Sequence, residues 1–356
     1  MMIRSMDEFR SFLDHHTLAD GEQLMLYLGD RSASWLEQIR IESNARNITV
    51  FGGIFPGLLH DGSYMREGLL VQTVRPLYRA LVHPFLFRLP SSLPPIAGNT
   101  AVVLIDGLSG KFRDLIDTME TKMGKGITYI GGGAGFYDMV QRPCLFDNSG
   151  VYQDAAFVCL LPGLSHVAVR HGWEKMDGPY EITEADQNIL HSLDGCNAMD
   201  VYCDAIEAHR SIILSKEDFF AVAKEHPFGL LQADGTVVVR DPIACTDSRD
   251  IICVADLPKQ STAYILHGNK RTLLASSLEV ADECARHRGE RHSPMLFNCI
   301  SRAMFLEDEF HKEIRNIQNQ LAHPLTGTLS IGEIATRAGG GIVIHNKSTV
   351  IGLVPA

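Results

Sequence analysis

The sequence predicts an α/β protein with mixed sheets, built from repeated β-α-β-β units with helices packed on them and divided into two domains. Two observations lead to this prediction. Strand-like apolar runs alternate with segments of helical periodicity along most of the 356 residues, which is typical of α/β architecture. Short hairpins also interrupt the crossovers, and this favours sheets that mix parallel and antiparallel neighbours.

Two units in the first half of the chain repeat one order of elements. The strand, helix and strand of these units lie at 23–29, 32–41 and 48–51 and again at 101–105, 111–123 and 127–130. The second strand ends in Gly52-Gly53 in one unit and in Gly131-Gly132-Gly133 in the other. The letters before the glycines also agree, ITVF against ITYI. We therefore predict an internal duplication in which Gly52 and Gly131 are equivalent.

A weaker third copy is expected at the end of the chain, and a polar seam precedes it. The strand, helix, strand and hairpin of this copy lie at 295–300, 307–321, 327–331, 341–345 and 348–353. The turn-rich stretch 177–197 indicates a boundary between domains. We expect an N-terminal helical extension at 1–22, an N-terminal domain with the duplication at 23–190, and a C-terminal domain at 191–356.

Composition excludes several classes of function. Lys and Arg number 32 against 43 Asp and Glu, so the formal charge is −11, which disfavours nucleic acid and anionic membranes. No apolar run reaches the ~18 residues of a membrane span, and acidic residues near the N-terminus argue against a signal peptide. The eight cysteines form no C-x-x-C pair, so we interpret them as buried free thiols and expect no metal site. These features predict a cytoplasmic protein.

The glycine pairs are the first candidates for a ligand site. Strands that end in Gly52-Gly53 and Gly131-Gly132-Gly133 allow a ligand, or another backbone, to approach closely. The spacing of the glycines is not that of a dinucleotide loop, and no phosphate-binding loop occurs. Tight bends in a twisted sheet and a ligand-facing loop both remain open.

Other candidate residues lie where predicted strands end. His171 and Trp173 follow a strand and could stack on a small polar ligand, hold a metal, or be structural. Arg240 could bind a carboxylate with two hydrogen bonds, or pair with a buried acid. Cys299 could act as a nucleophile only beside a base that lowers its pKa, and a cysteine in an apolar strand is usually inert.

Four motifs resemble those of FIST-domain proteins. They are Ile54-Phe55-Pro56, the C-x-x-R of Cys299 to Arg302, the G-E-I that contains Glu333, and His345-Asn346-Lys-Ser-Thr349. The resemblance extends over about 23–353 and is most specific in the C-terminal part. It implies a sensory module for small ligands, amino acids among them, that signals to a partner such as a histidine kinase or diguanylate cyclase. One branch of the family is similar to haem-containing nitric-oxide sensors, for which His171 or His345 could supply the axial ligand.

These observations together predict a non-enzymatic sensor that signals to a partner in trans. Its ligand, an amino acid or small carboxylate, would lie in a cleft lined by the glycine-rich strand ends, with Phe55, His171 and Trp173 at the site. Arg240 and Arg302 would bind the carboxylate, unless Arg302 pairs internally with Glu333. Glu333 and Asn346 would hold the rest of the ligand. The alternatives are a haem-binding nitric-oxide sensor, an enzyme that depends on Cys299, and a structural adaptor.

Overall fold

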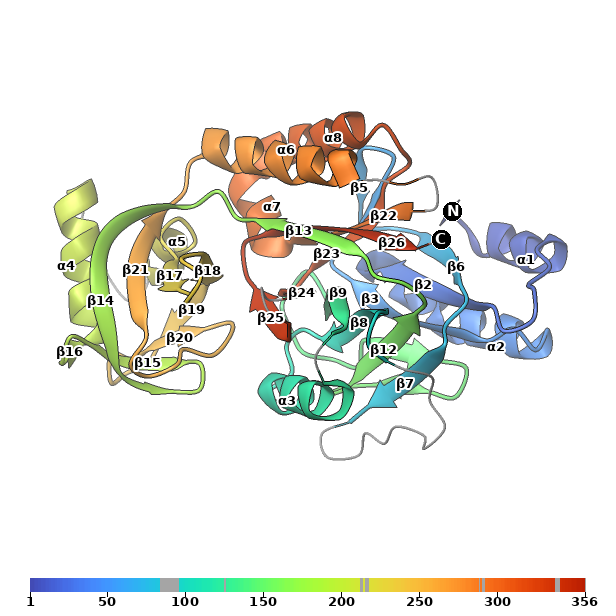
Figure 1. Cartoon of the computed structure of the whole chain (residues 1–356), viewed down its shortest axis with the longest axis horizontal. Coiled ribbons are helices and arrows are strands. Elements are labelled where there is room, and N and C mark those ends of the chain that lie inside the picture. Colours follow the sequence, from blue (N-terminus) through green and yellow to red (C-terminus); the bar gives the residue numbers. More distant parts are fainter. Residues whose placement is uncertain are drawn as a thin grey trace.

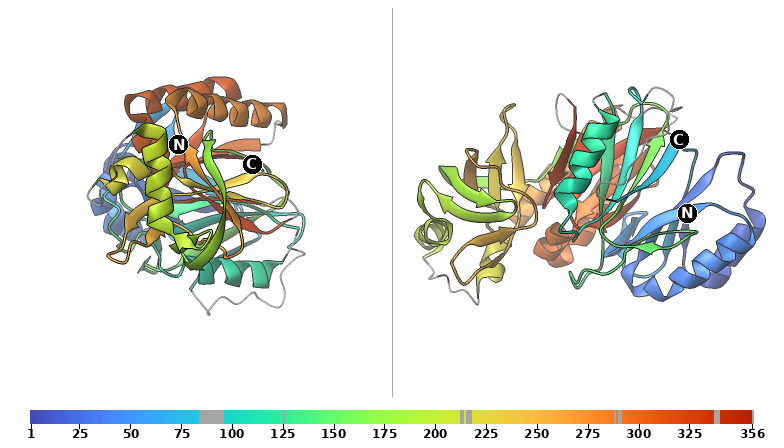
Figure 2. Two further views of the ribbon diagram at one scale, coloured as in Figure 1. Left: turned by 90° about the vertical axis from the view of Figure 1, so that its left-hand side faces the viewer. Right: turned by 90° about the horizontal axis from the view of Figure 1, so that it is seen from below.

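The computed structural model describes residues 1–83, 96–124, 126–211, 214, 218–287, 289, 292–336 and 340–355. The chain forms two bodies (Figure 1). The three-sheet body contains the described residues up to 173 and from 268 onward, and the smaller body contains those between 174 and 267. The view from below shows the smaller body at one end of the long axis (Figure 2, right).

The three-sheet body consists of three units of the predicted kind. The strands and helices of the first are β2 (Gln23–Gly29), α2 (Leu36–Ala45), β3 (Val50–Phe55), β4 (Gly57–His60), β5 (Ser63–Met65) and β6 (Leu69–Val74). Those of the second are β8 (Thr100–Asp106), α3 (Phe112–Met123), β9 (Thr128–Ala134), β10 (Leu145–Asp147), β11 (Val151–Tyr152) and β12 (Ala156–Leu161). Those of the third are β22 (His292–Cys299), α7 (Ile300–Leu306), α8 (Phe310–Leu321), β23 (Thr326–Ser330), β24 (Glu333–Thr336), β25 (Ile342–His345) and β26 (Thr349–Pro355).

The three sheets have the same strand order, and each is built around the strands of one unit. Three further strands, β1 (Met2–Ile3), β7 (Tyr78–Val82) and β13 (His166–Arg170), each close one edge. The three orders are β1-β6-β2-β3-β10-β11, β7-β12-β8-β9-β24-β25 and β13-β26-β22-β23-β4-β5. The hairpin at the far edge always comes from another unit: the second unit lends its hairpin to the first, the third to the second, and the first to the third. This cyclic exchange ties the units together.

Strand registers confirm the predicted equivalence of the glycines and extend it to the third copy. Gly52 lies opposite Leu26 in the parallel pair β2–β3, and Gly131 lies opposite Val103 in β8–β9. Gly327 takes the same place opposite Leu296 in β22–β23. The predicted fold class, mixed sheets built from repeated units, is therefore confirmed.

The apolar run of a central strand such as β8 packs against two different hydrophobic clusters, one on each face. Along β8, Val102 and Leu104 belong to a cluster that all three units share, whereas Val103 and Ile105 pack with residues of α3. Because neighbouring strand residues point to opposite faces, a strand buried on both faces must be apolar throughout. Helices cover the outer faces: α1 (Met6–His15) with α2, then α3, and α6 (Lys270–His287) with α8 (Figure 1).

The smaller body is one sheet with two helices. Its elements are β14 (Glu174–Asp186), β15 (Ile189–Leu193), β16 (Cys196–Asn197), α4 (Ala198–Arg210), α5 (Phe219–Ala223), β17 (Phe228–Leu231), β18 (Val237–Arg240), β19 (Pro242–Cys245), β20 (Ile251–Cys253) and β21 (Thr262–His267). The expected seam at 177–197 is therefore the β14–β15 hairpin of this sheet, and the boundary expected at 190/191 falls within β15. Polar turn residues mark hairpin tips as well as linkers, and sequence alone does not separate the two. The expected N-terminal extension holds α1, but its β1 is an edge strand of the first sheet.

No helix among the described residues is both long enough and apolar enough to cross a membrane.

Candidate functional site

Two cavities lie where the smaller body meets the three-sheet body. One, of about 240 Å³, lies between α3 and the smaller body and is lined by Arg113, Asp256 and Arg240 among others. The other, of about 890 Å³, lies beside β13 and α6 and is lined by His171, Trp173 and His345 among others. Both have β18 and β25, two sheet edges, in their walls. The joint between the bodies is therefore the candidate ligand site.

Arg240 connects the bodies at the smaller cavity. Its Nε donates to the carbonyl of Asp256 (2.7 Å), and its Nη1 donates to the carbonyls of Val239 (3.0 Å) and Ile344 (3.1 Å) across the joint. Among the described residues, Nη2 has no hydrogen-bond acceptor. Burial lowers the pKa of Arg240 to about 10, so the side chain remains charged at neutral pH. A ligand carboxylate in this cavity could accept from Nη2.

A second cation and an acid stand beside Arg240. Arg113 Nη1 of α3 lies 3.8 Å from Asp256 Oδ2 of the smaller body. Burial raises the pKa of Asp256, and the guanidinium groups of Arg113 and Arg240 oppose this rise. The walls of the smaller cavity thus contain positive and negative groups together with apolar side chains such as Phe112 and Ile344.

His171 and Trp173 lie at the joint, and their polar atoms are largely committed to the protein. The Trp173 backbone N–H donates to His171 Nδ1 (3.0 Å), and the ring also hydrogen-bonds the backbone of Val237 in the smaller body. Burial lowers the pKa of His171 to about 4, so the ring is neutral. The Trp173 indole N–H donates to the carbonyl of Lys347 (3.4 Å), and its ring packs on Phe305 at a centroid distance of 5.0 Å. These contacts favour the structural interpretation of the pair.

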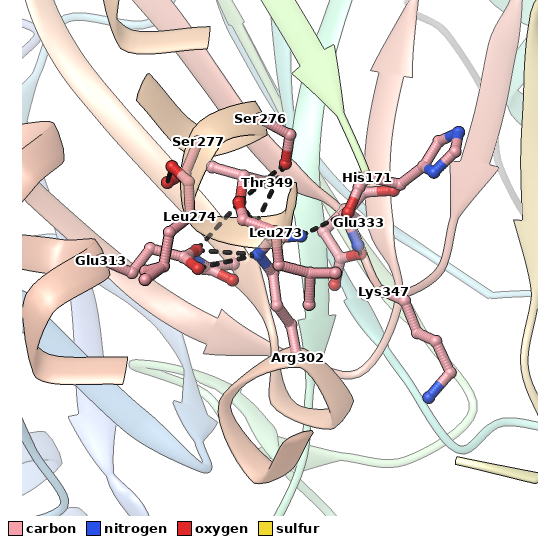
Figure 3. Close-up of polar contacts among 12 residues, drawn as sticks. His171, Leu273, Leu274, Ser276, Ser277, Arg302, Glu313, Glu333, Lys347 and Thr349 are labelled. Carbon is pink, nitrogen blue, oxygen red and sulfur yellow. Dashed lines mark hydrogen bonds and ion pairs between the residues drawn. The ribbon is translucent and has the colours of Figure 1, made fainter. Parts of the chain in front are cut away.

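Arg302 lies in the core, which corrects the carboxylate-binding role expected of it (Figure 3). Its side chain is 0% exposed, and its Nε donates to both carboxylate oxygens of Glu313 (2.8 and 3.1 Å). Its terminal nitrogens donate to the carbonyls of His171 and Leu273 and to Ser276 Oγ. The ion pair is with Glu313 and not with Glu333, because α8 carries Glu313 over the end of β22.

Glu333, Asn346 and Cys299 form a buried group behind the joint and line neither of the two cavities. Glu333 accepts from Ser330 Oγ (2.9 Å) and from the backbone N–H of Ser348 (3.3 Å), and burial raises its pKa well above the usual range. Burial likewise raises the pKa of the Cys299 thiol, which suits an inert cysteine better than a nucleophile. Asn346 is 1% exposed, and its Oδ1 has no hydrogen-bond partner among the described residues.

The glycine-rich strand ends and Phe55 pack inside the three-sheet body and do not line either cavity, which corrects the expected cleft. A Cβ on Gly52 or Gly131 would collide with a carbonyl of the neighbouring strand. A Cβ on Gly132 would collide with Phe297 and Ser330 of the third unit, and one on Gly133 with the carbonyl of Ile331. A Cβ on Gly53 would lie 3.0 Å from the Cβ of Ala134 and 3.2 Å from Leu145 Cδ2, and Phe55 packs on Tyr27 at a centroid distance of 5.6 Å. At Gly52, Gly131 and Gly133 the close approach that glycine permits is thus to a neighbouring backbone, and at Gly53 and Gly132 it is to packed side chains.

Comparison with known families supports the resemblance read from the motifs. The FIST N domain matches residues 23–196, and the FIST C domain matches residues 198–336. The chain belongs to the FIST family. FIST domains are sensory domains for small ligands in signalling proteins. The family boundary at 196/198 follows the β14–β15 hairpin, so the smaller body draws its strands from both FIST domains. No curated protein matches the chain.

The joint does not suit haem, the cofactor of the alternative that the sequence resemblance left open. Of the two nominated axial ligands, His171 has its ring nitrogens in internal hydrogen bonds. His345 lines the larger cavity, and burial lowers its pKa to about 3, so it is neutral. That cavity, however, presents four carboxylates against one arginine: Glu174, Asp234, Glu279, Glu283 and Arg170. These acids would repel the propionates of haem. No group of three or more His, Cys, Asp or Glu in the described part of the chain could hold a metal ion.

Lys347 and Asp241 lie buried beside the two cavities without lining them, and the sequence indicated a role at the joint for neither. Lys347 lies in the His345-Asn346-Lys motif, between the two strands of the hairpin predicted at 341–345 and 348–353. A lysine in a turn is normally exposed, so nothing in the sequence pattern predicted its burial at the joint.

Proposed function

We propose that this FIST protein senses a small carboxylate, with amino acids as the leading class, in the smaller cavity at the joint. The observation that supports this most directly is the Nη2 of Arg240, which has no acceptor among the described residues of a cavity that Arg240 lines. A guanidinium held by its Nε and Nη1 presents Nη2 in a fixed direction, and an oriented charged donor suits a carboxylate oxygen. Asp256 would accept from the ammonium group of an amino acid.

A ligand in this position would touch both bodies. Arg240 and Asp256 belong to the smaller body, whereas Phe112, Arg113 and Ile344 belong to the three-sheet body. Because the ligand binds both, its affinity depends on the angle between them, and it shifts the molecule towards the arrangement that it binds better. A partner protein that contacts both bodies could read this difference. In the FIST family such partners are signalling proteins, and we propose a histidine kinase or diguanylate cyclase in the cytoplasm.

A thermal-shift screen over amino acids and small mono- and dicarboxylates tests the proposal. A ligand that binds only the native protein raises its stability by ~2.7 kcal/mol at a hundredfold excess over Kd. The Arg240→Lys variant, which retains the charge but not the planar group, should bind such a ligand roughly tenfold more weakly or worse. Arg142→Lys is the matched control, because Arg142 forms an exposed ion pair with Asp138. The absence of any stabilising carboxylate, or equal affinity in Arg240→Lys, would contradict the proposal.

A further inference from the structure

Lys347 is a charged side chain that crosses from one body into the other. It stands at the tip of the β25–β26 hairpin, with a positive φ of 53°. Its side chain is 0% exposed, and in Figure 3 it points away from the Arg302 group. A lysine is rarely buried without partners, so groups that compensate its charge are expected around it.

The partners of Lys347 Nζ come from the smaller body and from its connection. Nζ lies 3.0 Å from Asp241 Oδ1, close as an ion pair although its angle is poor for a hydrogen bond. Nζ also donates to the carbonyl of Lys224 (2.9 Å) and lies 5.1 Å from the centre of the Trp173 ring. Asp241 is itself 2% exposed. Both charges are therefore out of water only while the bodies are together.

The smaller body is attached by two neighbouring crossings of the chain. The pair Glu174–His267 begins and ends the antiparallel strands β14 and β21, where both crossings enter the smaller body. Gly172 precedes one crossing with a φ of +79°, and Gly268 follows the other. A Cβ on Gly268 would collide with the Trp173 ring. Two adjacent crossings with a glycine at each form the geometry of a hinge.

We propose that the Lys347–Asp241 ion pair is a latch that holds the smaller body against the three-sheet body, and that the molecule opens about Gly172 and Gly268. A buried ion pair suits a latch because desolvation offsets most of its attraction. When the bodies separate, water solvates both charges again, so the free energies of the open and closed arrangements remain similar. Removal of one partner leaves the other charge buried and unpaired, and this favours the open arrangement.

The latch lies next to the proposed ligand cavity, so this inference deepens the proposed function by assigning its regulation. Asp241 follows Arg240 directly, and Lys347 comes three residues after Ile344. The Arg240–Ile344 hydrogen bond and the Lys347–Asp241 ion pair therefore join the same two segments. A carboxylate bound at Arg240 Nη2 would therefore act on the same two segments that the latch joins.

Small-angle scattering and amide hydrogen exchange on the full chain, without any ligand, test the latch separately from the ligand proposal. Lys347→Met and Asp241→Leu should each increase the radius of gyration and speed exchange in β18 and β25. The double variant Lys347→Met/Asp241→Leu should return both readouts towards wild type, because no unpaired charge remains. Lys312→Met is the control, since Lys312 pairs with Glu309 on the surface of the three-sheet body.

Two outcomes would overturn the latch. One is unchanged scattering and exchange in both single variants. The other is a loss of protection spread evenly over the three sheets, which the double variant fails to repair, because the pair would then stabilise the core. Ligand binding is tested only by the thermal-shift screen, so either result can fail without affecting the other.

Discussion

The buried ion pair Arg302–Glu313 is the residue-scale feature with the largest expected effect on stability. Arg302→Met leaves the Glu313 carboxylate in the core without its cation, although Asn298 and Thr349 still donate to it. We expect the free energy of unfolding to fall by ~3–5 kcal/mol. Chemical denaturation monitored by circular dichroism measures this change.

The matched variant Arg142→Met removes an exposed ion pair with Asp138 and should cost no more than ~1 kcal/mol. A loss of carboxylate binding in Arg302→Met without a loss of stability would return Arg302 to the ligand site.

His171 gives a second residue-scale prediction, on the dependence of stability on pH. Burial lowers its folded pKa to about 4, whereas an unfolded histidine titrates near 6.5. The unfolded chain therefore binds more protons in this window, so stability should fall as the pH drops from about 6.5 towards 4. His171→Asn keeps an acceptor for the Trp173 N–H but does not titrate, and its unfolding midpoint should change less with pH. A slope in His171→Asn equal to that of the wild type would show that His171 is not buried in its neutral form.

At the scale of elements, the equivalent glycines let each parallel strand pair close. A Cβ at Gly131 would collide with the Val103 carbonyl, so β8 and β9 would have to move apart. We expect Gly131→Ala to lower the free energy of unfolding by at least ~2 kcal/mol. Gly110→Ala is the control, because a Cβ there meets nothing within 4 Å and should leave stability nearly unchanged. Equal denaturation midpoints for the two variants would contradict the packing argument.

At the scale of the whole molecule, the exchanged hairpins should make the three units unfold together. Each sheet contains a hairpin from another unit, so no unit can open without exposing a strand edge of its neighbour. Native-state hydrogen exchange in rising denaturant should show β2, β8 and β22 losing protection at one concentration. The smaller body, with its own core, should open in a separate step. Early loss of one unit alone would refute this coupling.

Haem binding is a property of the whole cleft, because it needs an axial ligand, an apolar slot and partners for the propionates. With four acids in the cavity that His345 lines, we expect reconstitution with haem to give no stoichiometric Soret band. Titration followed by absorbance measures this directly. A saturable band that His345→Ala abolishes would place the protein with the haem-binding branch.

Much of the fold could be predicted because it depends on local sequence patterns. The alternation of strand and helix, the repeated glycine endings and the third copy all depend on periodicity and turn chemistry within ~60 residues, and the structure contains them. The pairing of hairpins across units could not be predicted, because the sheet edge that a hairpin joins belongs to a segment far away in the sequence. The seam predicted at 177–197 contains the end of the FIST N domain at 196, but in the structure it is a hairpin within one sheet and not a linker between the bodies, because a polar turn looks alike in both.

The sequence by itself determined the fold class, the repeats and the FIST family, and it placed His171, Trp173 and Arg240 as candidates that all lie at the joint. Only the tertiary structure decided what each charged group does. Arg240 and Arg302 both end a strand or follow one, yet Arg240 lines a cavity while Arg302 is enclosed with Glu313. Lys347 lies in a turn, where a lysine is expected to be exposed, yet its side chain is buried against Asp241. The physical reason is that a charge is tolerated in the interior only where distant segments bring it a partner, and the spacing of residues along the chain does not record which segments meet.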